Sequence, residues 1–142
     1  MAFQGFIKGV RYIPVPAPVF GELLQEIQDI TELKIILRII RLLHNKKGLE
    51  RYVSIDELLA DRVLSIGMGS TDLNTRRTHI LQCLESSEKR KILIKINRKD
   101  TDTFAYFLNT EFERQAIGKM KDIEHHSDFE PWETGEDRPN IY

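Results

Sequence analysis

The stretch that decides the fold runs from Ser70 to Leu108 and reads STDLNTRRTHILQCLESSEKRKILIKINRKDTDTFAYFL. Its first half predicts a helix, because apolar residues recur at three- and four-residue spacing and so share one face: Leu73, Ile80, Leu81 and Leu84. Arg76 and Arg77 fall toward the opposite face, and Thr71 stands where an N-cap is expected.

The second half of this stretch predicts a hairpin. Ile92, Ile94 and Ile96 alternate with Lys91, Leu93 and Lys95, the period of a half-buried strand with the isoleucines inside. A charged tip, 97–102, leads to an aromatic-rich second strand, 104–108. A helix followed by a basic hairpin is the layout of a winged helix, in which the helix enters a DNA groove and the hairpin lies along the backbone. The fold class expected is therefore α+β and mostly helical, a winged helix-turn-helix.

An extended arm precedes this fold. Pro14, Pro16 and Pro18 exclude a helix before Val19. The arm carries too many large apolar residues for a free tail, so we expect it to lie on its own domain or on a second subunit. As an extended segment with unpaired backbone groups, it is a candidate for pairing between subunits. The residues predicted to form an oligomer interface are Phe3, Phe6, Tyr12, Ile13 and Phe20.

Four further elements complete the expected order. A first helix is predicted from Phe20 to Ile30, and a core helix from Thr31 to His44 with the inner residues Leu33, Ile36, Leu37, Ile39, Ile40 and Leu43. Arg51 to Val53 reads as a short edge strand. Ser54 and Glu57 form a capping box that begins a helix reaching about Arg62. After the hairpin, Asn109 and Thr110 can cap a helix from Glu111 to about Ile123 with the apolar face Phe112, Ala116, Ile117 and Met120.

The length and composition indicate one globular domain with terminal additions. Of the 142 residues, 41% are hydrophobic and 30% charged, and one cysteine excludes an internal disulfide. We expect an arm and first helix at 1–30 for oligomerisation, a winged-helix domain at 31–123, and an acidic flexible linker at 124–142 that leads to a missing second domain. The sequence has no membrane-spanning stretch or secretory signal, so a cytoplasmic location and no membrane partner are expected.

Charge is distributed unevenly along the chain. Residues 122–142 hold seven acidic side chains and one basic, whereas Arg76 to Lys99 holds eight basic side chains against Glu85 and Glu88. Phosphate contact requires positive charge at such a place, although charge runs also simply solvate a surface. The residues predicted to bind DNA are Asn74, Arg76, Arg77, Lys91, Lys95, Arg98 and Lys99. The alternatives are that Asn74 belongs to a cap, that the arginines pair with Glu85 or the tail, and that the hairpin tip is only solvated.

No pattern favours an enzyme. Gly67 and Gly69 follow no strand and lack the third glycine of a phosphate-binding loop. Cys83 lies on the Ser70 helix beside Leu84, which indicates a buried small side chain rather than a nucleophile. His44 and His79 stand singly, and the adjacent His125 and His126 do not share a helix face. We therefore expect no catalytic residue, no metal and no cofactor.

Three stretches resemble the DnaD-like replication-initiation proteins, which are primosome components. The family's N-terminal winged-helix domain is similar to two segments of this chain, Ile30 to Lys34 and Arg51 to Asp61. Its last wing strand is similar to the segment from Tyr106 to Thr110, and the opening of its second, helical domain is similar to the segment from Arg138 to Tyr142. The resemblance implies an N-terminal module that self-associates and works with replication proteins such as a helicase loader. It also implies that the second domain is involved in DNA binding. The alternatives are a winged-helix transcription regulator that reads an operator through the Ser70 helix, and a pure oligomerisation or protein-interaction scaffold.

Overall fold

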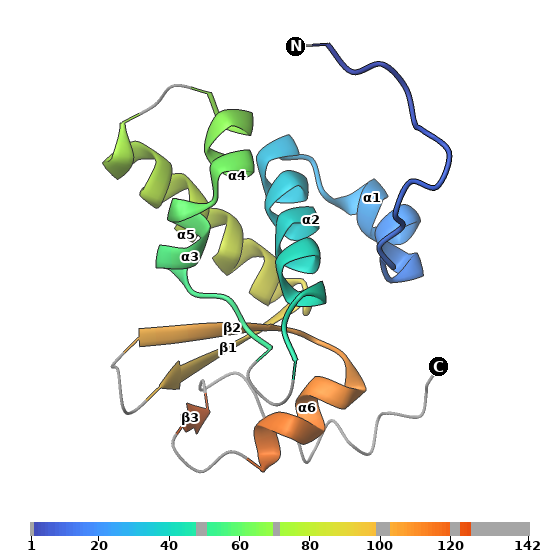
Figure 1. Cartoon of the computed structure of the whole chain (residues 1–142). Helices are drawn as coiled ribbons and strands as arrows, with labels where there is room; N and C mark the ends of the chain where they lie inside the picture. The colour runs from blue at the N-terminus through green and yellow to red at the C-terminus, as the bar shows by residue number, and fades with distance from the viewer. Residues whose placement is uncertain (1, 48–50, 70–71, 99–102, 120–122, 126–142) are drawn as a thin grey trace.

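The computed structural model describes residues 2–47, 51–69, 72–98, 103–119 and 123–125. The fold is α+β, with helices α2 to α5 on one side of a β1–β2 hairpin and α6 on the other (Figure 1). No helix within these ranges has the length and apolar character needed to cross a membrane. The elements in order are η1 (Ala17–Phe20), α1 (Glu22–Glu26), α2 (Ile30–His44), α3 (Ile55–Ala60), α4 (Arg62–Gly67), α5 (Leu73–Lys89), β1 (Leu93–Arg98), β2 (Thr103–Leu108), α6 (Glu111–Gly118) and β3 (Ile123–His125).

Helix α2 is the core helix, as its sequence predicts, but its inner face is rotated from the predicted one. The buried residues are Glu32, Ile35, Ile36, Ile39, Ile40 and Leu43, whereas Leu37, expected inside, is 41% exposed. Burial of Glu32 explains the rotation. Its carboxylate accepts hydrogen bonds from Ser87 Oγ at 3.0 Å and from Arg90 Nε at 3.2 Å. A buried carboxylate is tolerated only with such partners, and these are supplied by α5 and its C-cap.

Two short helices replace the single helix predicted after Ser54. The predicted cap is present, since Ser54 Oγ accepts from the Glu57 amide at 3.1 Å, while the Glu57 carboxylate pairs with Lys46 at 2.8 Å. Helix α3 ends at Ala60 rather than Arg62, because Asp61 adopts an extended conformation. Asp61 then begins α4 by accepting from the Leu64 amide at 3.0 Å. The same carboxylate forms a bidentate ion pair with Arg38 of α2, whose Nε and Nη2 donate to Oδ2 and Oδ1 at 2.8 and 2.9 Å.

Helix α5 begins one residue later than the predicted N-cap implies. Asp72, rather than Thr71, is the N-cap and accepts from the Thr75 amide at 2.7 Å. The buried residues of α5 are Ile80, Cys83, Leu84 and Ser87. Leu73 and Leu81 were expected on the inner face, but they are 57% and 39% exposed. The buried face of α5 is therefore narrower than the apolar pattern suggested. It includes the small polar residue Ser87, which leaves room for Glu32 of α2.

Both faces of the β1–β2 hairpin contribute buried residues. The predicted inner side chains Ile92, Ile94 and Ile96 are buried, and Leu93, expected on the opposite face, is buried as well, whereas Lys95 and Asn97 are half-buried. On one face Leu93 and Tyr106 join the cluster formed by the helices. On the other, Ile94 and Ile96 pack with Ala105, Phe107 and Ile117, the last from α6. Strands β1 and β2 pair antiparallel, and β3 pairs with the other edge of β1. The predicted edge strand at 51–53 is reduced to one bridge, in which Val53 exchanges two backbone hydrogen bonds with Tyr106 of β2.

The C-terminal helix is shorter than predicted. Thr110 caps α6 as expected, accepting from the Glu113 amide at 3.1 Å. The helix ends at Gly118, and Ile123, expected at its end, begins β3 together with two residues assigned to the linker. Phe112, expected on the inner face, is 58% exposed. Met120, Thr71 and the linker residues 126–142 lie outside the described residues.

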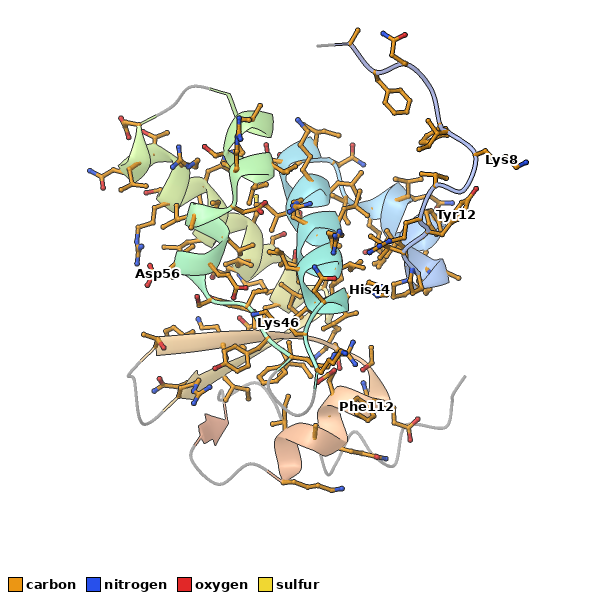
Figure 2. All side chains as sticks on the ribbon, in the orientation of Figure 1. Lys8, Tyr12, His44, Lys46, Asp56 and Phe112 are labelled. Atoms are coloured by element: carbon orange, nitrogen blue, oxygen red, sulfur yellow. The ribbon has the colours of Figure 1, made fainter. Side chains whose placement is uncertain are left out.

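The arm packs on its own domain only at its end. The predicted helix from Phe20 to Ile30 is a 3₁₀ turn followed by the five-residue α1, because Gly21 takes a non-helical backbone conformation between them. Val19 is 5% exposed and belongs to the helical core cluster, and Val15 packs against that cluster. Earlier residues extend away from the helices, as Lys8 shows in Figure 2.

Candidate nucleic-acid interface

The first turns of α5 present the polar residues that the sequence placed there. Asn74 and Arg77 are exposed and Arg76 is half-buried. Arg77 Nη1 lies 3.7 Å from Asp56 Oδ1 at the start of α3, with both side chains largely exposed. Arg76 Nε is buried and has no hydrogen-bond acceptor among the residues described. An exposed ion pair of this kind contributes at most about 1 kcal/mol, so an incoming phosphate can replace Asp56 as the partner of Arg77.

The hairpin cations are held by aromatic rings. Lys95 Nζ lies 4.3 Å from the centroid of the Phe104 ring, and the Arg98 guanidinium lies 5.1 Å from the centroid of the Tyr52 ring. Arg98 Nη1 also donates a hydrogen bond to the Tyr52 hydroxyl. These contacts position the two charges while leaving them positive. Lys99 belongs to the tip, outside the described residues.

These residues divide into two groups. The N-terminal turns of α5, the start of α3, the end of β1 and the start of β2 lie on the same side of the domain, at the left in Figure 1. Asp56 is labelled on that side in Figure 2. Lys91 follows the opposite end of α5, about 25 Å away for a helix of this length, and has a left-handed backbone conformation with φ of 69°. Lys91 therefore does not lie beside Asn74. Arg90 is held by Glu32 and Glu26, so it too is absent from this face.

Every large aromatic residue predicted for the oligomer interface is exposed. Phe3, Phe6, Tyr12 and Phe20 are 73%, 83%, 86% and 66% exposed, while Ile13 is half-buried. Phe3 and Phe6 contact one another edge to face, with ring centroids 5.0 Å apart. The arm thus keeps a set of apolar side chains that its own domain does not cover.

A cluster that the sequence analysis did not find joins the start of α2 to the middle of α5. Asp29 Oδ2 lies 3.2 Å from His79 Nε2 and 3.5 Å from Cys83 Sγ. Burial raises the pKa of the Cys83 thiol to about 12, and the nearby Asp29 carboxylate adds to the shift, which excludes a free thiolate nucleophile at neutral pH. The spacing of His79 and Cys83, four residues apart on a helix, was visible in the sequence. Asp29 is 50 residues from His79, and only the fold brings it there.

No family model, curated protein or solved structure matches this chain.

Proposed function

We propose that this domain is a winged helix-turn-helix module that binds DNA without catalysis, as the N-terminal part of a DnaD-like replication-initiation protein. The observation that carries the proposal is the order of the elements and their pairing. A core helix, α2, is followed by the Val53 bridge, the α3–α4 pair, the long α5 and the β1–β2 hairpin. Val53 pairs with the outer edge of β2, which gives the spatial order Val53, β2, β1. That order is expected of a winged helix.

In this proposal α5 is the helix that enters the groove and the hairpin is the wing. The N-terminal residues of a recognition helix make the contacts to base edges, and Asn74 and Arg77 occupy those turns. The wing contributes Lys95 and Arg98 to phosphates, which require charge and little geometry. Asp56 stands beside Arg77, so the face carries both signs of charge. Such a face supports backbone contact of modest affinity better than tight readout of one operator sequence.

Self-association is the second part of the proposal. Phe3, Phe6 and Tyr12 extend from the domain on a segment that has no helix to bury them. Exposed apolar groups gathered in one segment mark an interaction surface. The same arm from a second copy is the occupant we propose, as the resemblance to self-associating initiation proteins implies. This feature favours the replication-initiation role over a regulator that works as a monomer.

The test of DNA binding compares two double variants of equal charge. Arg77→Ala with Lys95→Ala removes one cation from the proposed recognition helix and one from the wing. The control, Lys89→Ala with Lys119→Ala, removes two exposed cations from the far end of α5 and the end of α6. Fluorescence anisotropy is measured with several unrelated duplexes over a range of salt concentrations.

We expect all duplexes to be bound alike and the first variant to bind each more weakly. The slope of log affinity against log salt should flatten by about 1.8 for two lost phosphate contacts, with the control unchanged. Binding confined to one sequence would support the operator-reading regulator instead. If the wild-type chain binds no duplex at low salt, the DNA-binding part of the proposal is wrong, and a self-association scaffold is left.

A further inference from the structure

We propose that Asp29, His79 and Cys83 form a zinc-type metal site between the start of α2 and the middle of α5. The three side chains offer a carboxylate oxygen, an imidazole nitrogen and a sulfur, and these atoms all lie within 4.8 Å of one another. The inference does not depend on DNA binding, and its test uses no DNA.

The distances match the edges of a tetrahedral coordination sphere. With metal–ligand bonds of about 2.0–2.3 Å, two ligand atoms at a tetrahedral angle lie about 3.3–3.6 Å apart. Asp29 Oδ2 is 3.2 Å from His79 Nε2 and 3.5 Å from Cys83 Sγ. Two of the three edges therefore already have about the required length, and the third, between His79 and Cys83, is no longer than 4.8 Å.

The backbone holds the three ligands in place. His79 and Cys83 are separated by four residues on α5 and so project from the same face of the helix. Asp29 is the N-cap of α2, where its Oδ1 accepts from the Thr31 amide at 2.9 Å. That bond fixes the carboxylate and leaves Oδ2 directed at His79 and Cys83. A metal ion would replace the two hydrogen bonds at Oδ2 without moving either helix.

The ligand types select the metal. A thiolate with an imidazole suits zinc, and a carboxylate with monodentate geometry is also a common zinc ligand. On binding, the Cys83 thiol loses its proton to solvent and the Sγ–metal bond takes its place. His79 would bind through Nε2, leaving Nδ1 free to donate a hydrogen bond.

The site is open on one side. The Asp29 and His79 side chains are 45% and 40% exposed, whereas Cys83 is 3% exposed and forms the inner wall. His79 also lines a shallow hollow whose other residues are Asn74, Thr75, Thr78 and Gln82. Solvent in this hollow can reach the fourth coordination position. Three protein ligands and one exchangeable position make a site that a single chain completes.

Cobalt(II) is the probe for this site, because its thiolate complexes absorb in the near ultraviolet and its tetrahedral complexes absorb strongly in the visible. The chain has one cysteine, so any thiolate-to-cobalt band reports Cys83. The full chain is titrated with Co²⁺, and Zn²⁺ is then added to displace it. The variants are His79→Gln, Asp29→Asn and Cys83→Ser, with His44→Gln as the control for an exposed histidine outside the cluster. Asn is itself a good N-cap, so Asp29→Asn retains the start of α2.

We expect one Co²⁺ per chain with a thiolate band that Zn²⁺ abolishes. Zinc at a hundredfold excess over its dissociation constant should raise the melting temperature by about 5–10 °C. His79→Gln and Asp29→Asn should weaken binding by roughly tenfold or more, Cys83→Ser should remove the band, and His44→Gln should behave as wild type. A wild-type chain without a thiolate band overturns the proposal. So does a band whose affinity is unchanged in His79→Gln, a variant of an exposed side chain that leaves the core intact.

Discussion

Asp61 is the residue whose removal should disturb the arrangement of α2, α3 and α4 most sharply. It ends α3, caps α4 through the Leu64 amide, and pairs with Arg38 of α2 through both carboxylate oxygens. Its side chain is 9% exposed and that of Arg38 is 24% exposed. One carboxylate thus links three helices at a largely buried position, where water is a poor substitute for its hydrogen bonds.

The cost of Asp61→Ala can be worked from these contacts. Losing an N-cap costs about 1 kcal/mol, and leaving a half-buried guanidinium without its charged acceptor costs about 1–3 kcal/mol. The two together predict a loss of about 2–4 kcal/mol in the free energy of unfolding, or roughly 5–15 °C in melting temperature. Asp61→Asn should cost about 1 kcal/mol less, because Asn still caps α4 while its amide group cannot accept from both Arg38 nitrogens.

Denaturant unfolding followed by circular dichroism measures these values. Asp56→Ala is the matched control, since Asp56 also lies at a helix start but is 81% exposed and pairs with Arg77 at 3.7 Å. It should cost less than about 1 kcal/mol. The reasoning is refuted if Asp61→Ala and Asp56→Ala are equally stable, or if Asp61→Asn is no more stable than Asp61→Ala.

Three further predictions follow from the same contacts. The hydrogen bonds from Arg38 lower the pKa of Asp61, with burial opposing them. The contribution of Asp61 is therefore present above the unfolded pKa of about 3.9 and is lost as the pH falls through the lower folded pKa, so the stability gap between wild type and Asp61→Asn should narrow as the pH falls below about 4 in acid-unfolding experiments. Ile117→Ala empties a fully buried position against β1 and β2 and should lower the free energy of unfolding by about 2–4 kcal/mol in chemical denaturation. Phe112→Ala, at a 58% exposed position of the same helix, should lower it by under about 1 kcal/mol. Equal losses of stability in the two variants would mean that α6 does not cover the sheet. Phe6→Ser with Tyr12→Ser should give a folded monomer by light scattering where the wild-type chain is a dimer or larger, and a wild-type chain that is itself monomeric would contradict the proposed role of the arm.

The sequence predicted those features that depend on neighbouring residues. The caps at Ser54 and Thr110 were found because each is a short-range hydrogen bond between a side chain and an amide three residues on. The long helix α2, predicted from Thr31 to His44, was found because apolar residues recur within it at helical spacing. The break at Asp61 was missed, although an Asp that can cap the next helix was visible there.

The features that were missed depend on residues far apart in the chain. Leu37 was predicted to be buried but is exposed, because Glu32 is buried instead by its hydrogen bonds to Ser87 and Arg90, which are 55 and 58 residues away in the chain. The burial of Leu93, on the face opposite Ile94 and Ile96, was missed because no local pattern shows that the helices cover that side of the hairpin. The basic face was overestimated for the same reason, since the pairing of Arg90 with Glu32 cannot be read from the run Lys89 to Lys91.

The burial of α2 has a consequence for synthesis on the ribosome. The core cluster that contains its apolar face also includes Ile80 and Leu84 on α5, Leu93 on β1 and Tyr106 on β2. At translation rates of about 5–20 residues per second, roughly 4 to 15 seconds separate the synthesis of Leu33 from that of Leu108. During that time the isoleucine-rich segment from Leu33 to Leu43 lacks part of its native core cluster, and a nascent chain in this state is a substrate for chaperones that hold exposed apolar segments. Codon changes that slow elongation before β2 should therefore lower the soluble yield, while the same changes placed after Gly118 should leave it unaltered.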